Sequence, residues 1–361
     1  MRLIQVAVLT LHVVAAVEAA KARWTLHKSC YRNKEDTADD NELADAMIKS
    51  VNEAKSWANR ASSKIGESLL PLVGGVVGLP TRVAIGPLVG SNDDYGPAAK
   101  EIRDRFKKIE DMEGPVGRNA DSMGRYEKSK AWIDLENRED HYNNFVIICR
   151  PDIEMVEDPA GGPFGKPYDV VRKKHLFASH DFEKFLAQEE SEEFGGDWDK
   201  VPTPRIMALT QRDDKPLGKA PEGGRKRVPE TITFHPLWIK FQRSRNFGGW
   251  TEDDFREVTK FNALEDFKRR GEAKQPAVDI RPVDFLLSKS LTANILHEFF
   301  HLTYFGEMLD DNEGAYGWAN NVRNKNRRNP DLYAIIGTVL ELLNRDGQKY
   351  SVSAEGEVIS L

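Results

Sequence analysis

The sequence predicts an α+β fold in which a small β-sheet lies beside an apolar helix. Three observations support this prediction. Apolar residues recur every three or four positions in several segments, as is typical of amphipathic helices. Short apolar runs bounded by prolines indicate a few strands. One predicted helix contains the spacing His-Glu-x-x-His, within Leu296–His301.

Size and composition predict a single globular domain. The chain has 361 residues, of which 40% are hydrophobic, and this is enough to bury a full core. We expect one domain at 21–361, with a loop-rich insertion at about 151–229. The formal net charge is -6, from 52 basic and 58 acidic residues. This balance argues against a nucleic-acid partner, because there is no basic excess to neutralise phosphates.

The first twenty residues have the pattern of a secretory signal peptide. Arg2 precedes an apolar run at 3–17, and small residues follow around Ala19 and Ala20. A membrane anchor is the alternative, but the run is short for a span of about 20 residues. We therefore expect a secreted, extracellular protein without a membrane partner.

The two cysteines fit this prediction. Cys30 and Cys149 both follow the signal, and one disulfide is their simplest use in an oxidising compartment. Two free thiols are the alternative.

Helices dominate the first part of the mature chain. The first predicted helix follows the acidic segment 35–40 and ends at Gly66. Segment 69–90 is apolar, but prolines and glycines interrupt it, so we expect a packed loop there. A second helix is predicted to open at Pro97 and to continue to Ile109.

Strand patterns follow in the middle of the chain. Residues 145–149 form an apolar run that suits a buried strand ending at Arg150-Pro151. A strand is predicted at 205–209, and 231–241 also favours a strand broken by a proline. A helix is predicted around 181–188.

The His-Glu-x-x-His motif lies on the helix predicted from Phe285 to Leu302, with Gly306 as its stop. His297 and His301 lie four residues apart, so their imidazoles leave the same face and can bind one zinc ion. A helix with two incidental histidines is the alternative.

A third ligand and a base complete the expected site. Asp310, Asp311 and Glu313 all lie in the loop after the helix, and a carboxylate from this loop can reach the ion. Two imidazoles and one carboxylate leave the fourth position of zinc open for water. Glu298 lies beside the imidazoles and can serve as the general base.

The remaining motifs are less specific. The basic loop 322–328 either lines a cleft that favours acidic substrates or is merely solvated. Asn329 caps a helix that starts at Pro330 and ends by Gly347, and the tail 348–361 is a strand or a loosely held end. The other histidines of the mature chain lack ligand spacing, namely His27, His141, His175, His180 and His235.

The run 296–334 resembles the secreted fungal zinc metalloendopeptidases of the deuterolysin and peptidyl-lysine type, the aspzincins. In that family His-Glu-x-x-His is followed by Gly-Thr-x-Asp-x-x-Tyr-Gly. Tyr316-Gly317 matches the Tyr-Gly end, and the segment 329–334 (Asn-Pro-Asp-Leu-Tyr-Ala) is similar to the family's Asn-Ala-Asp-Ser-Tyr-Ala. The resemblance covers about the last quarter of the chain and implies a zincin-like metallopeptidase domain.

The resemblance also implies roles for individual residues. Counting back three positions from Tyr316, it selects Glu313 as the third zinc ligand, where the family has Asp. Asp310-Asp311 stand where the family has Gly-Thr. Asp310 therefore stays the first alternative to Glu313. Tyr316 is expected to donate a hydrogen bond to the developing oxyanion.

We therefore expect a zinc-dependent endopeptidase (EC 3.4.24 type), acting as a monomer on protein or peptide substrates with one catalytic Zn²⁺. The alternative is a secreted zincin-like binding or effector protein that has lost catalysis. An intact Glu298 favours the enzyme, because a carboxylate there has no necessary structural role without catalysis. Cleavage specificity and propeptide processing do not follow from the sequence.

Overall fold

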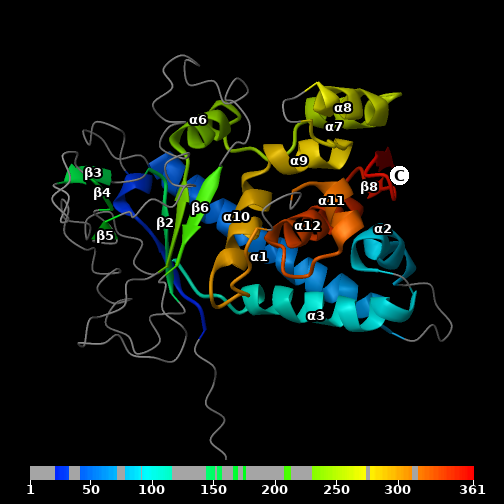
Figure 1. Ribbon diagram of the computed structural model, residues 1–361, viewed down its shortest axis with the longest axis horizontal. Coiled ribbons are helices and arrows are strands. Elements are labelled where there is room, and N and C mark those ends of the chain that lie inside the picture. The colour runs from blue at the N-terminus through cyan, green and yellow to red at the C-terminus, as the bar shows by residue number, and fades with distance from the viewer. Residues whose placement is uncertain are drawn as a thin grey trace, which may run out of the picture.

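The structure is a computed structural model, which describes residues 21–31, 41–70, 78–90, 92–115, 144–150, 153–156, 166–169, 174–175, 207–212, 230–273, 277–310 and 316–361. In these ranges helices pack against a small sheet (Figure 1), which confirms the α+β prediction. The signal predicted at 1–20 and the helix predicted at 181–188 lie outside them. None of the helices in these ranges is both long and apolar enough to cross a membrane.

The central sheet has the strand order β1-β2-β7-β6, with bounds β1 (Trp24–Leu26), β2 (Phe145–Ile148), β7 (Glu230–Phe234) and β6 (Ala208–Gln211). β1, β2 and β7 are parallel, and β6 is antiparallel to β7. The strand predicted at 145–149 is confirmed. β6 includes Ala208 and Leu209 of the strand predicted at 205–209, of which 205 and 206 lie outside the described residues.

Two smaller sheets lie outside this one. β3 (Ile153–Val156), β4 (Lys166–Asp169) and β5 (Lys174–His175) form an antiparallel sheet within the predicted insertion. β8 (Tyr350–Val352) and β9 (Val358–Ser360) form an antiparallel hairpin, so the C-terminal tail is a strand pair.

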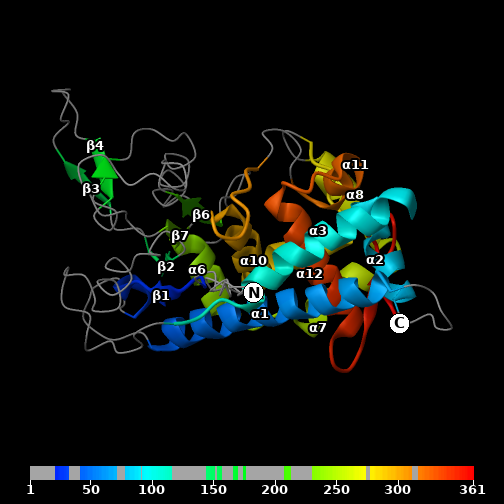
Figure 2. The same ribbon diagram turned by 90° about the horizontal axis from the view of Figure 1, so that it is seen from below.

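The helical layer is built around α1 (Asn41–Ser68), α3 (Asn92–Glu110), α10 (Leu291–His301) and α12 (Pro330–Asn344). α1 contacts all three of the others, and it runs beside α3 in both views (Figure 1, Figure 2). α1 confirms the first predicted helix, which was expected to follow 35–40 and to end at Gly66. α3 begins five residues before Pro97, where Asp93 and Asp94 in its first turn favour a helix N-terminus.

The packed loop predicted at 69–90 is wrong where the structure describes it, because Leu79–Val89 forms α2. Pro80 lies in the first turn of this helix, where a missing N–H costs no hydrogen bond. The apolar residues that suggested a packed segment form the buried side of the helix, namely Ala84, Ile85, Leu88 and Val89.

The strand predicted at 231–241 is wrong beyond Phe234, because Pro236–Ser244 forms α6. Pro236 is the first helical residue, and the side chain of His235 accepts a hydrogen bond from the Leu237 amide at 3.1 Å. The proline that was expected to break a strand therefore starts a helix.

The single helix predicted from 285 to 302 is two helices, α9 (Pro282–Lys289) and α10. Ser290 separates them and caps α10 by accepting a hydrogen bond from the Ala293 amide at 3.0 Å. α10 ends at His301, so Gly306 is not its stop. The remaining helices in the described ranges are η1 (Lys28–Cys30), α7 (Glu252–Thr259), α8 (Ala263–Glu272) and α11 (Trp318–Asn324).

Aromatic packing fixes α10 against α3 and α12. The ring of Phe300 stacks on Tyr333 at 4.1 Å and meets Phe106 edge-on at 5.6 Å. Gly337 lets α12 approach closely, since a Cβ there would lie 2.5 Å from Cδ2 of Leu296. The helix that carries the motif is therefore held rigidly from two sides.

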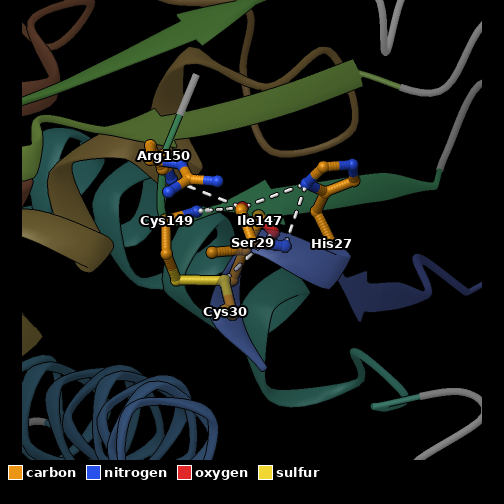
Figure 3. The surroundings of a disulfide bond; sticks show 6 residues. All are labelled: His27, Ser29, Cys30, Ile147, Cys149 and Arg150. Atoms are coloured by element: carbon orange, nitrogen blue, oxygen red, sulfur yellow. Dashed lines mark hydrogen bonds between the residues drawn. A yellow bond between two sulfur atoms is a disulfide. The ribbon is translucent and has the colours of Figure 1, made fainter. Parts of the chain in front are cut away.

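The disulfide between Cys30 and Cys149 is confirmed, and it joins η1 to the residue after β2 (Figure 3). The Ser29 hydroxyl accepts hydrogen bonds from the amides of Cys149 and Arg150 at 3.1 and 3.3 Å. Disulfides persist in oxidising compartments, so this bond is consistent with a secreted protein.

Replacing both cysteines by alanine should lower the free energy of unfolding by about 2 to 5 kcal/mol, because the bond closes a loop with a sequence separation of 119. Denaturant unfolding of the wild type and the double variant measures this difference. A change below about 1 kcal/mol would mean that the disulfide contributes little to stability.

Candidate metal centre

α10 presents His297 and His301 on one face, as their spacing predicted. Their Nε2 atoms lie 3.1 Å apart, and His297 is buried. Two imidazole nitrogens this close must share a proton or a cation. In zinc sites Zn–N distances are about 2.0–2.1 Å, so two nitrogens at tetrahedral angles lie roughly 3.3 Å apart. The observed separation therefore suits one shared metal ion.

Among the described residues, Asp310 brings a carboxylate close to both imidazoles. Its Oδ1 lies 3.5 Å from Nε2 of His297, and its Oδ2 lies 3.5 Å from Nε2 of His301. One ligand atom from each of the three residues lies within 4.8 Å of the others. Oδ1 is buried and accepts no hydrogen bond from the described residues. A bound cation would satisfy that oxygen, so the three residues fit a metal site.

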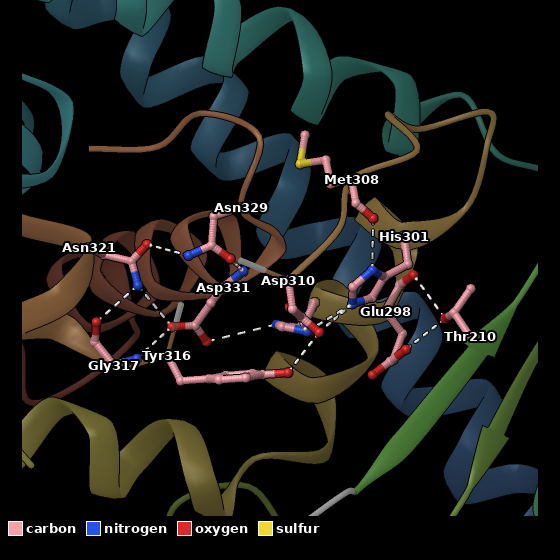
Figure 4. Close-up of polar contacts among 11 residues, drawn as sticks. Thr210, Glu298, His301, Met308, Asp310, Tyr316, Gly317, Asn321, Asn329 and Asp331 are labelled. Atoms are coloured by element: carbon pink, nitrogen blue, oxygen red, sulfur yellow. Dashed lines mark hydrogen bonds and ion pairs between the residues drawn. The ribbon is translucent and has the colours of Figure 1, made fainter. Parts of the chain in front are cut away.

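The turn after α10 brings Asp310 to this position. Leu302 ends the helix, and its carbonyl accepts hydrogen bonds from the amides of Gly306 and Glu307, which reverse the chain. His301 Nδ1 lies 2.9 Å from the Met308 carbonyl (Figure 4). A carbonyl can only accept, so His301 carries its proton on Nδ1. Its Nε2 lone pair is left to face the site.

Glu298 is buried, with 4% of its surface exposed. The hydroxyl of Thr210 on β6 donates to its Oε2 at 2.6 Å (Figure 4). The same hydroxyl lies 3.3 Å from the carbonyl oxygen of Glu298. β6 therefore holds this carboxylate beside the imidazole of the preceding residue.

Tyr316 closes one side of the site. Its ring stacks on the imidazole of His297, with centroids 5.8 Å apart and planes 16° apart. Its hydroxyl donates to Oδ2 of Asp310 at 2.7 Å (Figure 4). Although 57% of the Tyr316 surface is exposed, desolvation of its hydroxyl and the adjacent Asp310 carboxylate raise the pKa of Tyr316 well above its usual value, so the phenol stays a donor.

Asp331, the second residue of α12, lies behind His297. Its Oδ1 is 3.8 Å from Nδ1 of the imidazole. Burial alone would lower the pKa of His297, but the carboxylates of Asp331, Asp310 and Glu298 outweigh burial and raise that pKa to about 9. The site therefore favours a positive charge between the imidazoles and the carboxylates.

The structure thus brings together four of the predicted site residues, His297, Glu298, His301 and Tyr316, with the alternative ligand Asp310. Glu313 and Asp311 lie outside the described residues, so the role implied for Glu313 stays a prediction. No local pattern singles out Thr210, which lies 88 positions from Glu298 in the chain.

The other polar candidates do not join the centre where the structure describes them. Arg327 pairs with Glu101 at 2.9 Å, and Arg323 lies on α11 rather than in a loop. The prediction of a loop at 322–328 is therefore wrong for 322–324, which belong to α11. His235 caps α6, and His27 contacts Ser29.

Glu230 on β7 anchors the segment that follows α10 to the sheet. Its carboxylate accepts hydrogen bonds from the amide and the hydroxyl of Thr303, two residues after His301. Burial raises the pKa of Glu230 from 4.5 to about 7, although the hydrogen bonds from Thr303 partly oppose this shift.

Replacing Glu230 by glutamine should change how stability depends on pH. Between pH 4.5 and 7 the folded wild type binds more protons than the unfolded chain, so stability falls as pH rises through this window. The glutamine variant has no titrating group at this position, so its stability does not fall in this way. Its free energy of unfolding relative to the wild type should therefore rise by up to about 3 kcal/mol between these pH values and level off above them.

Denaturant unfolding at a series of pH values measures the change, with Glu355→Gln, at an exposed carboxylate, as the control. A difference between Glu230→Gln and the wild type that does not vary with pH would contradict the assignment.

The centre combines two imidazoles and a carboxylate around one point, a buried carboxylate beside them and a phenol donor. This arrangement can hold a divalent metal, accept a proton from a bound reactant and donate a hydrogen bond to an oxygen. No match was found when the chain was compared with models of protein families, with curated proteins and with solved structures, so its function is inferred from this geometry.

Proposed function

We propose that the protein is a secreted zinc-dependent endopeptidase. One observation carries the proposal. His297, His301 and Asp310 converge on one point. The buried carboxylate of Glu298 belongs to the residue that follows His297 in the chain. Thr210 donates a hydrogen bond to this carboxylate. These are the parts that metal-assisted hydrolysis requires.

His297, His301 and Asp310 are the proposed ligands. Zn²⁺ bound there supplies Lewis-acid chemistry, which polarises a carbonyl group and makes water more acidic. The hydrogen bond from His301 Nδ1 to the Met308 carbonyl keeps the opposite nitrogen free to bind. The orphaned Oδ1 of Asp310 provides the third contact.

Glu298 is the proposed general base. Its carboxylate accepts the proton of the attacking water and returns it to the departing amine nitrogen. The hydrogen bond from Thr210 fixes one oxygen of the carboxylate, which leaves the other for the proton. Tyr316 stays protonated, and its hydroxyl, which donates to Asp310 in this structure, turns to the carbonyl oxygen as negative charge develops there.

A protein or peptide substrate and secretion are parts of the same proposal. The Cys30–Cys149 disulfide supports an oxidising compartment. The buried and hydrogen-bonded Glu298 favours an active enzyme over a zincin-like binding protein that has lost catalysis. Burying a carboxylate costs folding energy that one hydrogen bond from Thr210 offsets only in part, and a catalytic role accounts for keeping the carboxylate there.

The test is hydrolysis of an unfolded, reduced and alkylated polypeptide by the purified protein. We expect cleavage that stops when a chelator removes the metal and returns when Zn²⁺ is added back. Zinc binding without cleavage would support the binding-protein alternative. Cleavage that survives complete metal removal would contradict the proposed mechanism.

A further inference from the structure

The turn that carries Tyr316 is held by two carboxylates from two different helices, buried Asp331 and partly buried Asp284. The amide of Gly317 donates to Oδ2 of Asp331 at 2.7 Å, and the amide of Trp318 donates to Oδ1 of Asp284 at 2.7 Å. Gly317 has φ +86, a backbone conformation that favours glycine. The two consecutive amides therefore point at two fixed acceptors, and the conformation of the turn is fully constrained.

The two carboxylates differ in one respect. Asp331 also faces the metal centre, because its Oδ1 lies 3.8 Å from Nδ1 of His297. Asp284 also accepts a hydrogen bond at 2.8 Å from the amide of Arg281, the residue just before α9. Asp331 thus joins a predicted ligand to the turn of Tyr316, whereas Asp284 joins that turn to the start of α9.

A polar network fixes the orientation of Asp331. Asn321 Nδ2 donates to the same Oδ2 at 2.9 Å, and Asn329 Nδ2 donates to Oδ1 of Asn321 at 2.9 Å (Figure 4). The Asp331 amide in turn donates to the side chain of Asn329 at 3.1 Å. With Oδ2 occupied by two donors, Oδ1 is the oxygen left for the imidazole.

We infer that Asp331 is a positioning residue for the metal centre, which holds the Nδ1–H tautomer of His297 and keeps its Nε2 free for the metal. The same carboxylate places Tyr316 over that imidazole through the Gly317 amide. This inference rests on the proposed metal site. Carboxylates that orient a ligating histidine typically change metal affinity 10- to 100-fold when they are removed.

The experiment compares Asp331→Asn with Asp284→Asn by titrating the metal-free protein with Zn²⁺ against a competing chelator. Each variant replaces one of the two carboxylates that accept a hydrogen bond from the turn. Only Asp331→Asn also changes the group that faces Nδ1 of His297. We expect Asp331→Asn to lower zinc affinity at least about tenfold and Asp284→Asn to change it less than about twofold. The visible spectrum of the Co²⁺-loaded protein should change in the first variant only.

Two further results separate the possible failures. If Asp331→Asn does not fold, Asn321→Ser keeps the carboxylate but removes one donor from it, and it should lower zinc affinity by a few fold. Equal losses in both aspartate variants, or an unchanged affinity in Asp331→Asn, would overturn the inference even if the wild type hydrolyses peptides. An affinity loss confined to Asp331→Asn in a protein without peptidase activity would support the inference and reject the proposed function.

Discussion

Replacing Glu298 by glutamine should lower the rate of peptide hydrolysis by roughly 10²- to 10⁴-fold, which is the usual contribution of a general base. The amide has nearly the same shape as the carboxylate and can still accept a hydrogen bond from Thr210, so the packing between α10 and β6 should persist. Neither imidazole is altered. Zinc should therefore stay bound with nearly the wild-type affinity.

The measurement is kcat on an unfolded polypeptide together with metal content of the same preparation. Glu307→Gln is the matched control, because this carboxylate belongs to the turn after α10 but its side chain is 58% exposed. The control should keep full activity. If Glu298→Gln lost its zinc, Glu298 would have to act as a ligand or a structural support, and its role as the base would be wrong.

Replacing Asp310 by alanine should weaken zinc binding by more than about a hundredfold, since a ligand should matter more than the residues that orient ligands. The carboxylate meets both imidazoles at 3.5 Å, and its loss leaves two ligands. Tyr316 also loses its acceptor. Hydrolysis should fall with the loss of metal.

Glu313→Ala is the matched variant, because it removes a carboxylate from the position that the family resemblance selects as the third ligand. If Asp310 is the ligand, Glu313→Ala should keep zinc affinity within a fewfold of the wild type. A larger loss in Glu313→Ala than in Asp310→Ala, measured by chelator competition, would return the assignment to Glu313.

The sequence predicted those parts of the centre that depend on local spacing. His297 and His301 share a face because they are one helical turn apart, and Glu298 follows from the same motif. The disulfide followed from a simple count of cysteines. The cap and first residue of α12 followed from Asn329-Pro330, and the structure confirms both.

The parts that depend on tertiary contacts were not predictable in this way. Thr210 reaches Glu298 from a strand 88 positions earlier, and Asp284 reaches the Trp318 amide across 34 positions. Local patterns also failed at prolines. Pro80 and Pro236 looked like breaks, but each lies in the first turn of a helix, where no N–H donor is required.

The third ligand shows the same limit. The resemblance selected Glu313, which lies outside the described residues, whereas the turn stabilised by the Leu302 carbonyl brings Asp310 to the imidazoles. Three acidic candidates within four positions cannot be ranked without the path of that turn. Of the three candidates the structure describes Asp310 alone, and its carboxylate lies within reach of both histidines.

The most direct test of the metal centre is zinc stoichiometry in the purified wild type and in the His297→Ala/His301→Ala double variant. After dialysis against Zn²⁺ and then against metal-free buffer, elemental analysis should find one zinc per wild-type chain and essentially none in the double variant. The variant should keep its disulfide and its helical circular dichroism, because neither imidazole is needed for the core. A wild type without zinc, or a double variant that retains it, would contradict the centre formed by His297, His301 and Asp310.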